Sequence, residues 1–224
     1  MGKLPISNFD LPQSVGSVSA TVIADQQATR VGDVIKNVSG VSLTQTRLGV
    51  NETYTSRGYS IGITGGAGSI LKNGLVTNIA GMPEAATLES IEVMKGSSAM
   101  LYGNVSGGLV VNLITKKPKF EYGGEVKMQA ASFNQYKPVA DVYGPITKNL
   151  AFRVIGTYEN DKSFRDVATT KRTYFNPSLL YKIGKKTTLL VQGEYLDAKI
   201  TPDFGIGTLD SGVCCQPQYL NLVF

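Results

Sequence analysis

Histidine is absent from this chain of 224 residues, and cysteine occurs only at the adjacent positions Cys214 and Cys215. Without histidine the chain has no imidazole general base, no Ser-His-Asp or Cys-His pairing and no His-based zinc site. The two cysteines do not form a CxxC zinc arrangement, and an ordinary disulfide between neighbouring residues is strained. Because these absences remove most parts of an enzyme or metal centre, we predict no catalytic residue, metal or cofactor.

Long hydrophobic runs and a strong excess of one charge are also missing. No stretch of about 20 apolar residues occurs, so a transmembrane helix is not expected and any membrane role depends on strands. The net charge of +5 comes from 22 basic and 17 acidic residues, and no segment is basic enough to indicate nucleic-acid binding. The first residues lack the basic and apolar pattern of a signal peptide.

The first half of the chain predicts a small α+β domain. A strand is expected at 17–24, and a helix follows whose buried face is Val31, Val34, Ile35 and Val38. The glycine-rich stretch 53–81 predicts turns between short strands. Alternating apolar residues at 91–93 and 109–113 predict two half-buried strands joined by a glycine-rich connection.

Residues 91–103, IEVMKGSSAMLYG, with residues 107–118, GGLVVNLITKKP, resemble the end of the plug domain of TonB-dependent outer-membrane receptors. In that family a strand, a KG-x-x-x-x-LYG turn, a Gly-Gly pair and an ITKKP strand lead into the barrel. Weaker similarities follow in the family's order: LPQSV at 11–15, VGDVIKNVSGV at 31–41, SRGY at 56–59, KNG at 72–74, SFRD at 163–166, YFNPSL at 174–179 and TPDFG at 201–205. The resemblance implies an α+β plug domain over 11–119, followed over 120–224 by antiparallel β-strands of an incomplete transmembrane β-barrel.

Longer strands with a two-residue period follow residue 120. In the stretch 150–159 the even-numbered residues, from Leu150 to Tyr158, form a largely apolar face, and the odd-numbered residues, from Ala151 to Glu159, form a mixed one. The stretch 187–196 divides in the same way. A soluble antiparallel sheet fits this alternation equally well, but the plug-like segment ahead of it favours a barrel. About five strands are expected at 121–199, whereas barrels of the family close at 22, so the chain looks truncated.

The resemblance implies a receptor fragment that binds and imports ferric siderophores across the bacterial outer membrane, without enzymatic chemistry. The implied partners are a ferric siderophore, the TonB complex and outer-membrane lipid, although no TonB box is recognisable here. Two alternatives stay open. One is a receptor for another large nutrient, such as a corrinoid or an oligosaccharide, and the other is a soluble plug-like interaction module detached from transport.

Residues near the outward-pointing plug loops of the family are the candidates for cargo contact. Arg47 comes first, because a guanidinium offers five donors in a planar fork to the oxygens of an iron chelate. Tyr59 and Met82 add aromatic and apolar contact. For ion pairs between plug and barrel we predict Arg57, Glu92 and Lys95, with Glu125 or Glu159 as the barrel partners.

Overall fold

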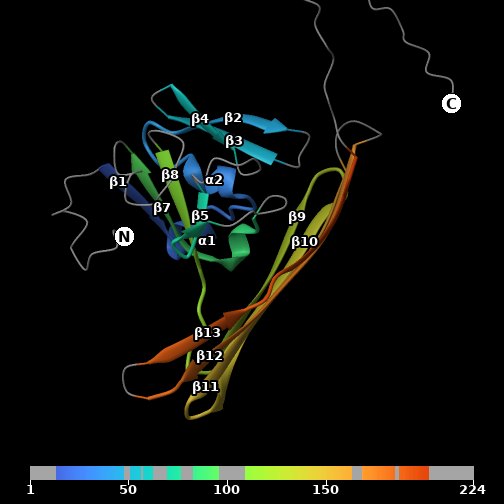
Figure 1. Cartoon of the computed structure of the whole chain (residues 1–224). Coiled ribbons are helices and arrows are strands. Elements are labelled where there is room, and N and C mark those ends of the chain that lie inside the picture. Colours follow the sequence, from blue (N-terminus) through green and yellow to red (C-terminus); the bar gives the residue numbers. More distant parts are fainter. Residues whose placement is uncertain are drawn as a thin grey trace, which may run out of the picture.

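The computed structural model describes residues 14–47, 51–56, 58–62, 70–76, 83–95, 109–162, 168–184 and 187–201. These residues form two groups of elements, shown in Figure 1. The N-terminal unit, residues 14–115, combines short strands with short helices, and the strand wall, residues 123–200, consists of long antiparallel strands. The N-terminal unit lies on one side of the strand wall, and residues 116–122 connect the two (Figure 1).

A five-stranded sheet is the frame of the N-terminal unit. Its spatial order is β1 (Ser14–Ser19), β7 (Leu88–Lys95), β8 (Leu109–Thr115), β5 (Ile70–Lys72) and β6 (Leu75–Val76). All neighbours are antiparallel except β5 and β8, which run parallel. The central strands β7 and β8 confirm the two strands expected from the alternating apolar residues. They are buried along almost their whole length and not half-buried as expected, because side chains pack against both faces of the sheet.

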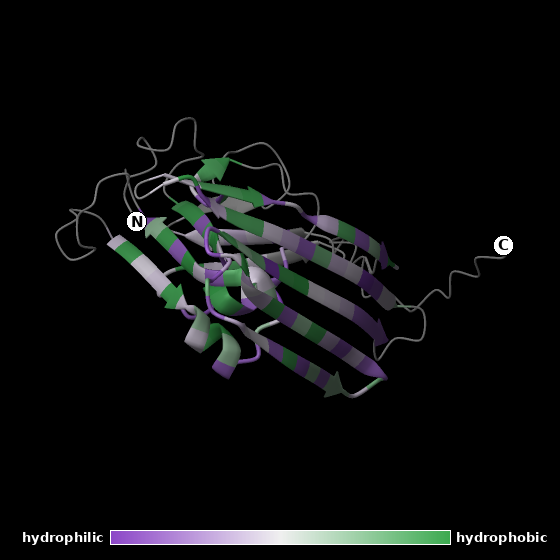
Figure 2. Ribbon diagram, turned by 90° about the horizontal axis from the view of Figure 1, so that it is seen from below, coloured by the Kyte–Doolittle hydropathy of each residue, from purple (hydrophilic) through white to green (hydrophobic). Residues whose placement is uncertain are grey.

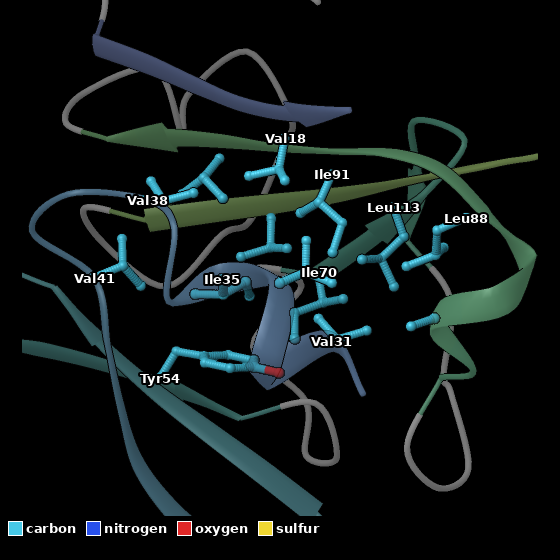
Figure 3. Close-up of a cluster of buried hydrophobic side chains, with 14 of the residues drawn as sticks. Val18, Val31, Ile35, Val38, Val41, Tyr54, Ile70, Leu88, Ile91 and Leu113 are labelled. Atoms are coloured by element: carbon cyan, nitrogen blue, oxygen red, sulfur yellow. The ribbon is translucent and has the colours of Figure 1, made fainter. Parts of the chain in front are cut away.

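Short helices and a second sheet complete the N-terminal unit. The helices are α1 (Ala20–Asp25), α2 (Val31–Ile35) and the 3-10 helix η1 (Ala85–Thr87). The second sheet contains β2 (Ser42–Arg47), β3 (Asn51–Ser56) and β4 (Tyr59–Gly62) in antiparallel order. In Figure 3 the ring of Tyr54 from β3 lies beside α2 within the cluster of buried side chains.

The expected buried face of the helical segment is confirmed, although the helix is short. Val31, Val34, Ile35 and Val38 are all buried in the main hydrophobic core. The strand expected at 17–24 is wrong from Ala20 onward, because β1 ends at Ser19 and the chain turns into α1. There Ile23 is buried in the same core, so tertiary packing overrides the β-propensity of Val22 and Ile23.

The strand wall is a single antiparallel sheet. Its strands are β9 (Gly123–Ala131), β10 (Gln135–Thr147), β11 (Leu150–Lys162), β12 (Thr169–Lys182), β13 (Thr188–Gln192) and β14 (Tyr195–Ile200). Each of the first four pairs with its neighbour in sequence, and both β13 and β14 pair with β12. The strand expected through 187–196 is therefore interrupted at Gly193 and Glu194.

The two faces of the strand wall differ in polarity, and Figure 2 shows its strands striped by alternating hydrophobic and hydrophilic residues. Polar and charged side chains are buried on the face toward the N-terminal unit: Lys137, Asp141, Arg153, Thr157, Glu159, Arg172, Asn176 and Ser178. Large apolar and aromatic side chains are exposed on the opposite face: Val126, Met128, Tyr136, Val142, Ile146, Tyr158, Phe175, Leu179, Tyr181, Leu189, Val191 and Tyr195. The division of β11 into two faces agrees with the one expected from the sequence. Within the described ranges, no helix is long and apolar enough to cross a membrane.

Candidate functional site

Four charged side chains form a closed ring between the N-terminal unit and the strand wall. Arg30 and Glu84 come from the N-terminal unit, and Lys137 and Glu159 come from β10 and β11. Arg30 Nη1 lies 3.3 Å from Glu84 Oε2, and Arg30 Nη2 donates to Glu159 Oε2 at 2.6 Å. Lys137 Nζ donates to Glu84 Oε1 at 2.5 Å and lies 3.9 Å from Glu159 Oε2. Positive and negative groups thus alternate around the ring.

Local backbone structure places the two ring residues of the N-terminal unit. Arg30 is the extended residue just before α2, with φ −126° and ψ 161°, and it forms an isolated antiparallel bridge with Glu84. The Asp33 carboxylate accepts a hydrogen bond from the Arg30 backbone N–H at 3.2 Å. Although burial opposes it, the contact with Lys36 and this N–H bond lower the pKa of Asp33. The start of α2 therefore fixes the direction in which the Arg30 side chain leaves the backbone.

The four ring side chains are largely buried, so their opposite charges have to compensate one another. The side chains of Glu84, Lys137 and Glu159 are at most 6% exposed, and that of Arg30 is 17% exposed. Burial lowers the pKa of Arg30, but the nearby Glu84 and Glu159 carboxylates outweigh it and raise that pKa above its usual value. Because a buried charge is costly without its partner, each ring member depends on the others.

A second charged group fixes the connection between the two parts. Arg153 of β11 makes two hydrogen bonds to Asp141, at 2.8 and 2.6 Å, and donates to the Lys117 carbonyl at 3.0 Å. Lys116 Nζ lies 3.2 Å from the same Asp141 carboxylate. The segment that leaves β8 is thus held against the inward face of β10 and β11 before the first strand of the wall begins.

A cavity of about 240 Å³ lies between α1 and η1 on one side and β9 and β10 on the other. Its surface toward the N-terminal unit is largely small and apolar, including Ala20, Ala24 and Ala28. Its six charged lining residues are joined in three ion pairs: Lys116 with Asp141, Lys127 with Glu125, and Lys137 with Glu84. The part of the chain that the structure describes contains no group of three or more His, Cys, Asp or Glu residues that fits a metal ion.

Of the three plug residues expected to form ion pairs with the barrel, the structure describes two. Glu92 and Lys95 lie on β7, where Glu92 accepts from Asn112 Nδ2 at 3.3 Å and Lys95 donates to the Ser39 carbonyl. Both contacts lie within the N-terminal unit, and the pairing of these residues with the barrel stays a prediction. Of the two suggested barrel partners, Glu159 does bridge to the N-terminal unit, but through Arg30. Glu125 pairs with Lys127 on its own strand.

The expected cargo residues also stay predictions. Arg47 ends β2 and Tyr59 begins β4, so both belong to the second sheet of the N-terminal unit, but their side chains are not among the described ones. Met82 and Arg57 lie outside the described residues, as do Cys214 and Cys215.

Three residues of the ring, Arg30, Glu84 and Lys137, were not predicted from the sequence. A signal existed for Lys137, a charged residue on the inward register of an alternating strand. Arg30 and Glu84 carry no comparable local signal.

Comparisons with known proteins agree with this architecture. Residues 7–110 match the family model described as TonB-dependent Receptor Plug Domain. The chain is 30% identical over 201 residues to the ferripyoverdine receptor of Pseudomonas aeruginosa, a match that covers 87% of this chain and 24% of that protein. It is 32% identical over 199 residues to the ferrioxamine B receptor of Salmonella typhimurium, covering 84% of this chain and 28% of that one.

A solved structure extends the likeness to three dimensions. The crystal structure of the ferripyoverdine receptor of the outer membrane of Pseudomonas aeruginosa, bound to ferripyoverdine, superposes with a TM-score of 0.75 at 26% identity. That match covers 86% of this chain and 26% of the receptor. The chain thus spans about a quarter of the length of the relatives it matches.

Proposed function

Because this chain belongs to the TonB-dependent receptor family, with the plug domain in its N-terminal half, we propose that it is part of an outer-membrane receptor that binds and imports ferric siderophores. We assign residues 11–119 to the plug and residues 120–224 to the beginning of the barrel. The family consists of receptors and transporters, and the proposed action is binding followed by gated passage.

The observation that carries this proposal is the polarity of the strand wall. Its charged side chains face the N-terminal unit, and its large apolar side chains face outward. Transmembrane barrels show this arrangement because lipid surrounds the outside and a polar lumen fills the inside. We therefore propose outer-membrane lipid as the partner of the outward face. A soluble interaction module has the opposite requirement, since its exposed face contacts water.

The remaining parts of the proposal concern cargo and energy. Two of the relatives are named for ferripyoverdine and ferrioxamine B, which favours a ferric siderophore over a corrinoid or an oligosaccharide. Iron stays chelated by the siderophore, so the receptor needs no metal ligands of its own. We propose that the TonB complex drives release, and that Arg47, Tyr59 and Met82 contact the cargo while Arg57 joins the plug–barrel ion pairs.

A chimaera tests this function directly. Residues 11–201 replace the aligned segment of the Pseudomonas aeruginosa ferripyoverdine receptor, and the protein is produced in a strain that lacks its siderophore receptors. We expect uptake of radioactive iron from ferripyoverdine or ferrioxamine B in cells with TonB and background uptake in cells without it. The intact ferripyoverdine receptor is the positive control. A chimaera that is folded in the outer membrane but transports neither cargo contradicts the proposal.

A further inference from the structure

The Lys72–Gly74 turn joins β5 to β6 and is fixed on the end of β8. Asn73 and Gly74 have φ values of 53° and 82°, the left-handed conformation that two-residue hairpin turns require and that Asn and Gly adopt most readily. The Asn73 N–H donates to the Leu113 carbonyl at 2.9 Å, and the Gly74 N–H donates to Asn112 Oδ1 at 2.9 Å. The turn therefore presents its side chains in one defined direction.

The same turn contacts the strand wall through both of its polar side chains. Asn73 Nδ2 donates to Thr115 Oγ1 at 2.9 Å and approaches Gln192 Oε1 at 3.4 Å. Thr115 Oγ1 donates to the same Gln192 oxygen at 3.1 Å. Lys72 pairs with Glu194, whose other oxygen accepts from the Tyr174 hydroxyl at 2.6 Å. The contact thus reaches the wall at Gln192, the last residue of β13, and at Glu194, within the interruption that precedes β14.

Pro177 explains why the strand is interrupted there. Ser178 pairs with Gln192 on one side and Phe175 pairs with Tyr195 on the other, so β13 and β14 keep one register and form one strand line. Gly193 stands opposite Pro177 in that register. The Gly193 N–H donates to the Pro177 carbonyl at 2.9 Å, but proline has no N–H with which to return the bond. One ladder hydrogen bond is therefore missing.

A relay of side-chain amides replaces the missing bond. Asn176 Nδ2 donates to the Gly193 carbonyl at 2.8 Å. Gln192 Nε2 in turn donates to Asn176 Oδ1 at 3.2 Å, which orients the Asn176 amide. Asn73 and Thr115 donate to Gln192 Oε1, at the tip of the same side chain. The relay of hydrogen bonds therefore runs from the turn in the N-terminal unit to the missing ladder bond at Pro177.

We propose that the Lys72–Gly74 turn is a latch that stabilises the strand wall at Pro177. While the turn is seated, Gln192 and Asn176 complete the ladder between β12 and the β13–β14 strand line. When the N-terminal unit moves and withdraws the turn, this strand line loosens from β12. The latch thus transmits a movement of the N-terminal unit to one particular wall strand, whatever the cargo of the receptor.

Hydrogen–deuterium exchange on the full chain, folded in detergent micelles, tests the latch. For Asn73→Ala we expect exchange in residues 187–201 to be at least about fivefold faster, because the relay loses its hydrogen bonds to the N-terminal unit. Exchange in β10 and β11 should stay unchanged. Pro177→Val restores a backbone donor opposite Gly193, so in the Asn73→Ala background it should return exchange in residues 187–201 to its original rate.

Two further variants keep the test decisive. Lys127→Ala removes an ion pair internal to β9 and should leave residues 187–201 unaffected. If Asn73→Ala unfolds the N-terminal unit, seen as lost protection in β7 and β8, then exchange is measured in Lys72→Ala. This variant removes the turn's ion pair to Glu194 and keeps the backbone hydrogen bonds of the turn, so it should also speed exchange in residues 187–201. Three results overturn the proposal: unchanged exchange in residues 187–201 with a folded N-terminal unit, equal acceleration across the whole wall, or no rescue by Pro177→Val.

Discussion

Arg30 is the residue on which the contact between the two parts depends most directly. Its guanidinium joins Glu84 within the N-terminal unit to Glu159 of the strand wall. Lys137 touches both carboxylates as well, but at 3.9 Å from Glu159 it is the weaker partner there. Removing Arg30 therefore leaves Glu159 buried with little compensation.

We predict that Arg30→Met lowers the free energy of unfolding of the N-terminal unit by about 3 kcal/mol, the cost of breaking a buried pair from one side. Lys36→Met is the matched control. It removes an ion pair to Asp33 at 3.0 Å whose side chains are 63% and 39% exposed, so it should cost less than about 0.5 kcal/mol. Urea unfolding followed by circular dichroism measures both variants. Equal costs would show that the ring does not hold the two parts together.

Glu52 is a buried acid away from the wall. Its Oε2 accepts from the Gly32 N–H at 3.0 Å and from the Tyr54 hydroxyl. Burial raises the pKa of Glu52 despite these donors. The folded chain then keeps a proton that the unfolded chain has already released. An unperturbed glutamate has a pKa of 4.5, and the folded chain raises the pKa of Glu52 above that value. As the pH rises from 4.5 to the raised pKa, the stability that Glu52 contributes therefore falls.

We predict that Glu52→Gln removes this loss of stability above pH 4.5. The loss of stability below pH 3.8 should remain. Because the pKa of Asp33 is lowered in the folded chain, the stability that Asp33 contributes is lost as the pH falls, opposite to the dependence for Glu52. Urea unfolding at several pH values between 3 and 8 measures the profile. Glu89→Gln, at an exposed position of β7, is the control and should leave the profile unchanged. An unaltered profile in Glu52→Gln contradicts the assignment.

Arg47 is the residue that we propose contacts the ferric siderophore. We expect Arg47→Ala to weaken binding of the ferric siderophore by the full-length chimaera about tenfold, because a charge-assisted hydrogen bond is lost. Arg47→Lys keeps the charge without the planar fork and should fall in between. Titration of the purified chimaera with cargo measures the dissociation constants, and equal values for all three proteins exclude Arg47 from the site.

At the scale of elements, the strands of the wall are distinguished by which face is polar. On β10 the inward residues Lys137 and Asp141 are buried, whereas the outward residue Val142 is 47% exposed. Burying charge on the inside and exposing apolar groups on the outside is unfavourable in water and favourable in a bilayer. The environment therefore decides whether these strands form a stable sheet.

We predict that Val142→Arg reduces folding of the chain into lipid vesicles, at a cost of about 2–4 kcal/mol if the residue lies near the middle of the bilayer. Val142→Leu is the control and should fold as the unmodified chain does. Folding is followed by protease protection in the presence of vesicles. If Val142→Arg instead yields a folded protein in plain buffer, the outward face is a water-facing one.

At the scale of the whole molecule, the hydrophobic core and the contact between the two parts have different compositions. The main core cluster consists entirely of residues from the N-terminal unit. The described hydrogen bonds and ion pairs between that unit and the wall are made by charged, amide, hydroxyl and backbone carbonyl groups, as in the ring around Arg30 and the latch at Asn73. Once separated, such polar groups can form hydrogen bonds with water instead, so a contact of this composition is compatible with the gated passage proposed above.

We predict that the full chain aggregates when produced without detergent, because its wall has apolar outward residues and, among the described strands, unpaired edges at β9 and at the β13–β14 strand line. The same chain ending at Lys119 should remain in solution at the same concentration. Light scattering and size-exclusion chromatography compare the two. A soluble, monomeric full chain would count against the barrel assignment.

The sequence by itself determined the features that depend on local spacing. The alternation from Leu150 to Glu159 fixed the two faces of β11, and the apolar positions from Val31 to Val38 fixed the buried face of the helical segment. Glycines and the KNG motif at 72–74 indicated turns, because few residue types other than Gly and Asn adopt the left-handed backbone conformation. These properties act between neighbours in the chain, so they are legible without the fold.

Only the tertiary structure decided which distant side chains meet. Arg30 and Glu159 are 129 positions apart, and Glu84 and Lys137 are 53 apart. Their pairing depends on how the N-terminal unit sits against the register of the wall, and single positions carry no trace of that placement. The same holds for Pro177, whose missing N–H acquires a consequence only because the strand register sets Gly193 opposite it and the Lys72–Gly74 turn beside it. Buried charges and ladder bonds are contacts between surfaces, and their partners exist only once the surfaces are brought together.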